Sequence, residues 1–81
     1  MANKIDSICT ANNIKLCTIY LKQGSENTYS SYGNYLSEFK IDKYFIVIEN
    51  KYYYNLSKLL IFNIYLNEKK PEKNSISFYF Q

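Results

Sequence analysis

The sequence lacks the residues from which most catalytic and metal sites are built. It contains no histidine and only two cysteines, Cys9 and Cys17. Zinc and iron–sulfur sites need more such ligands than this chain has, and histidine is the commonest general acid or base. The seven acidic residues lie singly along the chain, whereas a calcium-binding loop gathers several. We therefore expect no metal, no cofactor and no enzymatic activity.

Glycine and arginine are scarce as well. With two glycines and no arginine, the chain has neither a glycine-rich phosphate loop nor a guanidinium fork for phosphate. Two short patterns resemble catalytic motifs, Ser37 with Lys40 and Tyr54 with Lys58. Given ten lysines and ten tyrosines, about one match to the second pattern arises by chance. We interpret both patterns as ordinary surface residues.

Long apolar runs are missing too. The most apolar stretch, residues 59–66, falls far short of the roughly 20 residues needed to cross a bilayer. Residues 1–17 are interrupted by polar side chains such as Asp6 and Lys15, so we expect no signal peptide. Two cysteines do not make a disulfide framework, and we interpret them as free thiols. These features predict a cytoplasmic protein, within a host cell, that makes no membrane contact.

The composition that remains is rich in four residue types. Lysine, asparagine, isoleucine and tyrosine occur ten times each among 81 residues, which is typical of an A/T-rich genome. Hydrophobic residues make up 47% of the chain, enough for one core, so we expect a single domain over residues 1–81. The net charge is only +3. Small proteins of phages and other mobile elements often have this composition.

Hydrophobic periodicity predicts the main elements. Residues 2–11 show helical spacing, while residues 14–22 alternate as a strand does. Residues 43–49 form a continuous apolar run, typical of a buried strand. In residues 28–41 the apolar side chains recur every three or four positions, which favours a short helix.

The last third of the chain predicts a β-hairpin. Residues 59–66 and 75–80 both alternate, and the charged segment 67–74 between them contains the only proline, Pro71. We therefore predict an α+β fold, with an antiparallel sheet of four to five strands and one or two short helices on one face; a small all-β fold is the alternative. Residues 75–81 are expected at a sheet edge that invites pairing with a second copy.

Tyrosine is the residue with the clearest functional implication. Ten tyrosines are more than a small core absorbs, and tyrosine is enriched in recognition surfaces because it is large, stiff and amphipathic. A strand at residues 52–54 must also turn at least one ring outward. Codon bias placing tyrosine where phenylalanine would serve is an equally good explanation. The candidate binding residues are Tyr29, Tyr32, Tyr35, Tyr52, Tyr53 and Tyr54.

Nucleic-acid binding is the alternative, because lysines interleave with aromatic rings that bases stack on. Its candidate residues are Lys43, Lys51, Lys69, Lys70 and Lys73. The mild net charge and the missing arginines count against it.

The sequence thus favours a non-enzymatic protein-binding module. We expect a small stoichiometric inhibitor of the phage or mobile-element kind, such as an anti-CRISPR or another counter-defence factor. It would occlude a larger host protein or protein–nucleic-acid complex. A self-associating viral structural subunit is a second alternative.

Overall fold

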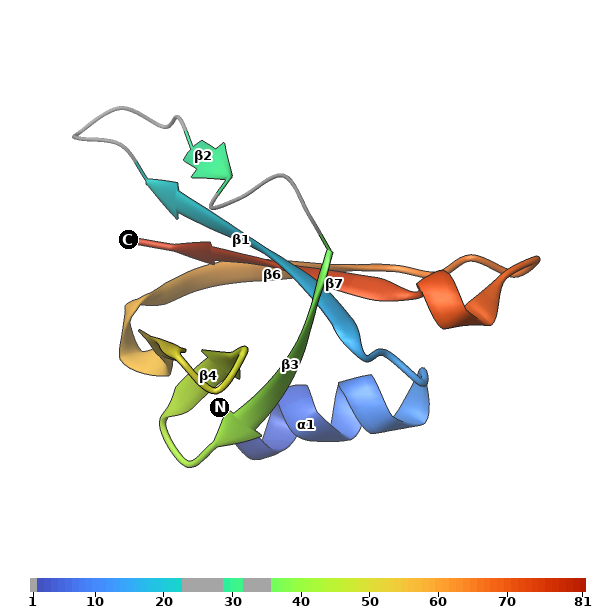
Figure 1. Cartoon of the computed structure of the whole chain (residues 1–81), viewed down its shortest axis with the longest axis horizontal. Coiled ribbons are helices and arrows are strands. Elements are labelled where there is room, and N and C mark those ends of the chain that lie inside the picture. The colour runs from blue at the N-terminus through green and yellow to red at the C-terminus, as the bar shows by residue number, and fades with distance from the viewer. Residues whose placement is uncertain (1, 23–28, 32–35) are drawn as a thin grey trace.

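The computed structural model describes residues 2–22, 29–31 and 36–81, and within them shows one α-helix beside a curved, mixed β-sheet (Figure 1). Six strands follow one another in the order β5-β4-β3-β1-β7-β6, and the short β2 pairs with the end of β1. The strands are β1 (Leu16–Lys22), β2 (Tyr29–Ser31), β3 (Ser37–Asp42), β4 (Phe45–Ile48), β5 (Tyr52–Asn55), β6 (Leu59–Tyr65) and β7 (Ser75–Phe80), with 3-10 turns η1 (Leu56–Lys58) and η2 (Pro71–Lys73).

Helix α1 (Ala2–Ala11) forms where the helical spacing predicts it. Ile5 and Cys9, one turn apart, are both buried against the sheet. The helix ends at Ala11, and the turn that follows includes Asn13, whose φ of 53° is a left-handed conformation that asparagine tolerates. The backbone N–H of Ile14 then donates to the carbonyl of Cys9 at 2.8 Å. No helix in the described part of the chain is long and apolar enough to span a bilayer.

The centre of the sheet is a parallel pair, β1 and β7. Cys17 and Ile19 of β1 face the core, as do Ile76, Phe78 and Phe80 of β7. The expectation of a purely antiparallel sheet is therefore wrong: the β1–β7 pair is parallel, whereas the other strand pairs among the described residues are antiparallel. A parallel pair needs a crossover connection, usually helical. Here the segment between β1 and β7, which carries the other strands, makes that connection.

The position expected for residues 75–81 is wrong for the same reason. Strand β7 lies between β1 and β6 rather than at an edge. The edge strands are β5 and β6. The hairpin itself is confirmed, since β6 and β7 pair antiparallel with Phe62 opposite Phe78. The segment that joins them is held by Asn74, which is buried: its Oδ1 accepts from the N–H of Asn67 at 2.7 Å, and its Nδ2 donates to the carbonyl of Asn12 at 2.9 Å.

The helix expected within residues 28–41 is wrong for the part that the structure describes. Residues 29–31 form β2, and residues 37–42 form β3. Along β3, Phe39 and Ile41 pack against the core while Lys40 and Asp42 are exposed. Burial that alternates every second residue is typical of a strand, and residues 37–42 form one. Two of the residues whose spacing favoured a helix, Tyr32 and Tyr35, lie outside the described residues.

Strand β4 confirms the buried strand expected at residues 43–49. Ile46 and Ile48 face the core, and β3 and β5 flank it. The sheet curls so that the inner side of β5 reaches β7, with the rings of Tyr54 and Phe80 5.5 Å apart. Helix α1 lies beside β3 under the sheet (Figure 1). One hydrophobic core results, to which α1, β1, β4, η1 and β7 contribute buried residues.

Candidate protein-binding surfaces

The three consecutive tyrosines of β5 divide between the two faces of the sheet. Tyr52 and Tyr54 are half-buried and pack against the core, whereas Tyr53 points outward and is 58% exposed. This follows from the twofold alternation of a strand. The ring of Tyr54 stacks on Phe80, and the Nζ of Lys51 lies 5.4 Å from the centre of the Tyr52 ring.

Tyr53 belongs to a group of outward-facing rings, Tyr44, Phe45 and Tyr53, which we call the ring patch. Tyr44, in the turn between β3 and β4, is 71% exposed. The rings of Phe45 and Tyr53 meet edge to face, 5.9 Å apart at 81°. The carbonyl of Tyr44 accepts the N–H of Leu56 at 2.8 Å, which fixes the turn to η1. The patch thus presents rings on an anchored backbone.

A hollow of about 700 Å³ lies next to the ring patch. Tyr44, Phe45 and Leu56 form its apolar wall. Its size is within the range of pockets that hold small ligands or a protruding side chain. The polar residues around it are Asn3, Lys43, Asn55 and Ser57. The hollow can accept an apolar group whose polar end reaches this rim.

Of the other tyrosines predicted to bind, Tyr29 lies on β2, where only the backbone is described. Tyr32 and Tyr35 lie outside the described residues. The six candidate tyrosines are therefore placed only in part. Those of β5 lie together, with one of the three on the outer surface.

A second tyrosine group, which the sequence did not single out, lies on the outer face of β1, β7 and β6. The rings of Tyr20 and Tyr79 stack 4.8 Å apart at 9°, and Tyr65 adjoins them. Burial is the main cause that raises the pKa of Tyr79, followed by the neighbouring Tyr65 hydroxyl. The available signal was the hairpin register, which puts Tyr65 and Tyr79 on the face opposite Phe62 and Phe78.

Strand β6 is the most apolar exposed element among the described residues. It pairs only with β7 within them, and residues 59–67 carry no charge. Long, exposed, apolar strand edges are sites of association, because their backbone donors and acceptors lack partners. The exposed apolar side chains of this segment, each 38–53% accessible, are Leu60, Ile61, Ile64, Tyr65 and Leu66.

The lysines proposed for nucleic acid divide into two groups. Lys43 and Lys51 lie in the turns that flank β4, at the lower left of Figure 1. The other group, in the segment around η2, lies at the far right. The five therefore do not form one basic face, which nucleic-acid binding favours. The second group comprises Lys69, Lys70 and Lys73.

The two cysteines are buried free thiols. Burial, with a smaller contribution from Asp6, raises the pKa of Cys9 to about 11. Burial, with a smaller contribution from Cys9, raises the pKa of Cys17 to about 12. Both thiols therefore stay protonated and weakly nucleophilic near neutral pH. No group of three or more metal-ligating side chains occurs in residues 2–22, 29–31 and 36–81.

Comparison with protein-family models, with curated proteins and with solved structures gave no match. The function is therefore inferred from the fold and the surfaces of the chain itself.

Proposed function

We propose that the protein is a non-enzymatic binding module that uses the ring patch to dock onto a larger protein or protein–nucleic-acid complex. The observation that carries the proposal is the exposure of Tyr44 and Tyr53 at 71% and 58%, with Tyr53 in contact with Phe45 and Tyr44 lining the hollow. An inhibitor of this kind acts by occlusion, one molecule for each partner site. The absence of histidine from the sequence is consistent with a function that needs no acid–base catalysis.

The physical basis is that the patch offers rings whose ordering costs little on binding. Tyr53 is already held against Phe45, and β4 and β5 fix the backbone on both sides. Rigid aromatic side chains lose little conformational entropy and dominate interface energies. Removal of a central ring from such an interface costs about 2 kcal/mol or more, which is roughly a 30-fold loss of affinity.

The experiment is affinity capture from an extract of the source cells, followed by titration of the purified partner. The double variant Tyr44→Ser/Tyr53→Ser removes the two exposed rings. Leu36→Ser is the matched control, since Leu36 is 49% exposed and lies outside the ring patch. We expect the wild type and the control to retain the partner at a fixed stoichiometry, and the double variant to lose it. Equal retention by the double variant would refute the role of the ring patch.

A further inference from the structure

The open edge of β6 has a sequence suited to one particular occupant. Among the described residues, β6 bonds to β7 on one side only, and its other edge is apolar. The order of apolar, polar and charged residues in this segment is nearly the same in both directions from Asn63. If a second β6 lay antiparallel with Asn63 opposite Asn63, apolar residues would face apolar residues in every pair but one, and the charges beyond both ends would be opposite in sign. The pairs would be Phe62 with Ile64, Ile61 with Tyr65, Leu60 with Leu66, Leu59 with Asn67, and Lys58 with Glu68.

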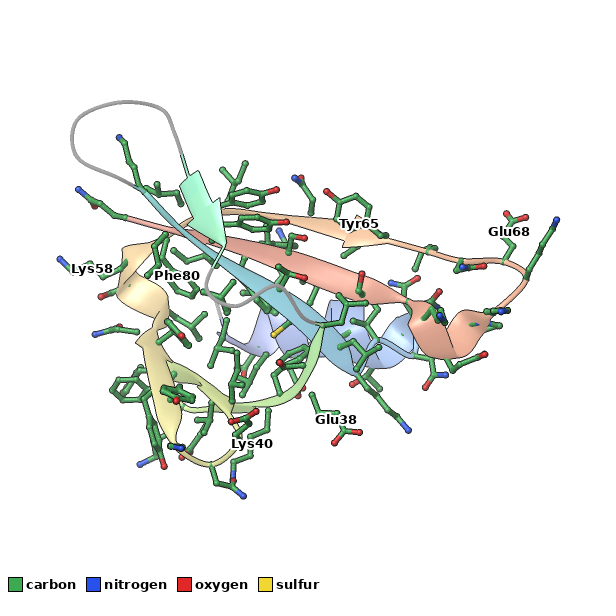
Figure 2. All side chains as sticks on the ribbon, turned by 45° about the horizontal axis from the view of Figure 1, so that its top comes forward. Glu38, Lys40, Lys58, Tyr65, Glu68 and Phe80 are labelled. Carbon is green, nitrogen blue, oxygen red and sulfur yellow. The ribbon has the colours of Figure 1, made fainter. Side chains whose placement is uncertain are left out.

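We propose that the occupant is a second copy of this chain. The two β6 strands pair antiparallel about a twofold axis at Asn63 and join the two sheets into one. Figure 2 shows Lys58 and Glu68 beyond opposite ends of β6, Lys58 in η1 and Glu68 in the segment that follows the strand, so each copy brings its positive end to the negative end of the other. Homodimers with such a twofold axis are the commonest soluble oligomers.

Charge selects this register over its neighbours. An axis placed between two residues would pair outward-facing side chains with core-facing ones, because the strand period is two. An axis at Ile64 keeps the faces but sets Lys58 against Lys70 and Glu68 against Leu60. An axis at Phe62 sets Lys58 against Leu66. Of these axes, only the one at Asn63 pairs both charges with opposite charges, and it leaves one apolar residue, Leu59, opposite a polar one, Asn67.

The local geometry of β6 agrees with this axis. Its pairing with β7 is regular from Ile61 to Tyr65, and the shift in register lies between Leu59 and Ile61. The regular stretch is thus centred on Asn63. On the outer face Ile61 of one copy would cover Tyr65 of the other, next to Tyr79. Cross-strand pairs of aromatic and β-branched residues stabilise antiparallel sheets.

The dimer is expected to be of moderate affinity. A stable interface buries about 1,200–2,000 Å² in total, and a single strand on each side is at the low end of that range. We expect a dissociation constant on the order of micromolar. Each exposed Lys58–Glu68 pair changes the affinity by a few-fold at most, so these pairs set the register rather than the strength. This inference is independent of the ring patch, which contains no β6 residue.

Sedimentation velocity of the purified chain from about 1 to 500 µM tests the association. We expect a monomer–dimer equilibrium for the wild type and a monomer for Ile61→Lys, which places a charge inside the paired stretch. Leu36→Lys is the matched control and should dimerise normally, because Leu36 is exposed outside β6. Circular dichroism shows whether each variant folds. A wild-type monomer across the whole range, which would leave the edge to a different protein, overturns the proposal.

Cross-linking and charge reversal test the register. Directly opposite residues in an antiparallel pair have Cα atoms about 4.5–5.5 Å apart, within the range of a disulfide. Asn63→Cys should therefore oxidise to a covalent dimer, whereas Leu66→Cys, which does not face itself, should oxidise far more slowly. Lys58→Glu should weaken the dimer several-fold, and Lys58→Glu/Glu68→Lys should restore it. Equal cross-linking at both positions, or no rescue by the double variant, refutes an axis at Asn63.

Discussion

The two faces of β5 predict opposite outcomes for substitutions at adjacent tyrosines. Tyr54 packs against the core and stacks on Phe80 at 5.5 Å. Tyr53 is 58% exposed and has an edge-to-face contact with Phe45. The same change to serine at each position therefore separates a structural ring from a surface ring. We expect Tyr54→Ser to destabilise the fold strongly and Tyr53→Ser to leave it almost intact.

The magnitude follows from the buried area. A half-buried tyrosine ring removes roughly 100 Å² of apolar surface from water, which is worth about 2.5 kcal/mol. The stacked pair with Phe80 adds about 0.5–1.5 kcal/mol, so Tyr54→Ser should cost roughly 3–4 kcal/mol. Tyr53→Ser loses chiefly the contact with Phe45, about 1 kcal/mol. A domain of this length has a total stability of about 4–12 kcal/mol, so the first loss is a large fraction.

Thermal unfolding monitored by circular dichroism measures the difference. At about 4–8 °C per kcal/mol, Tyr54→Ser should lower the Tm by more than about 12 °C, and Tyr53→Ser by less than about 8 °C. Tyr54→Phe is the control, because it keeps the ring and should retain most of the stability. The face assignment of β5 is refuted if Tyr53→Ser destabilises the fold as much as Tyr54→Ser does.

Further predictions concern the thiols and Asn74. A thiol reagent at pH 8 should not modify the folded chain, since burial raises the pKa of Cys9 to about 11 and of Cys17 to about 12, but should modify both residues in urea. In the unfolded chain the thiols ionise near their ordinary pKa of 9.0, so the free energy of unfolding falls as the pH rises from 9 toward 12. The variant Cys9→Ala/Cys17→Ala lacks these thiols and should lose less stability than the wild type over that range, as measured by urea titrations at each pH. Asn74→Ala should cost about 1–3 kcal/mol in urea unfolding, because it leaves the N–H of Asn67 and the carbonyl of Asn12 without their partner; an unchanged midpoint would contradict that role.

The sequence pattern predicted those elements in which buried residues recur at one regular spacing along the whole element. The helix at residues 2–11 has its buried residues, Ile5 and Cys9, one turn apart. Strand β1 alternates, and β4 is apolar throughout, with Val47 only 1% exposed on the side away from the core cluster. The hairpin of β6 and β7 was predictable because polar residues and Pro71 separate two alternating runs.

Pairing between distant strands could not be predicted in the same way. Nothing within residues 75–80 indicates that β1, over 50 residues earlier, pairs with them in parallel. A hairpin pattern also does not say which of its two strands faces the rest of the sheet. One feature does correlate with the central place of β7: its outward Ser75 and Ser77 are small enough to be buried beneath their neighbours, at 8% and 5% exposed.

The candidate surfaces were predictable only as far as strand alternation was known. It requires one of the three rings at residues 52–54 to face outward, and the structure shows that this ring is Tyr53. The exposure of Tyr44 depends on the turn between β3 and β4, where Lys43 has a φ of 51°. The stack of Tyr20 on Tyr79 depends on the parallel register of β1 and β7, which sequence alone did not reveal.

The composition of β6 links the fold to the proposed dimer. Native edge strands are usually protected by charge or proline. Charged residues make up 21% of this chain, so nine residues would carry about two charges on average, yet residues 59–67 carry none. The nearest charges, Lys58 and Glu68, stand just beyond this segment and are opposite in sign. An edge of this kind is stable in solution when another strand covers it, and its charges match a reversed copy of itself.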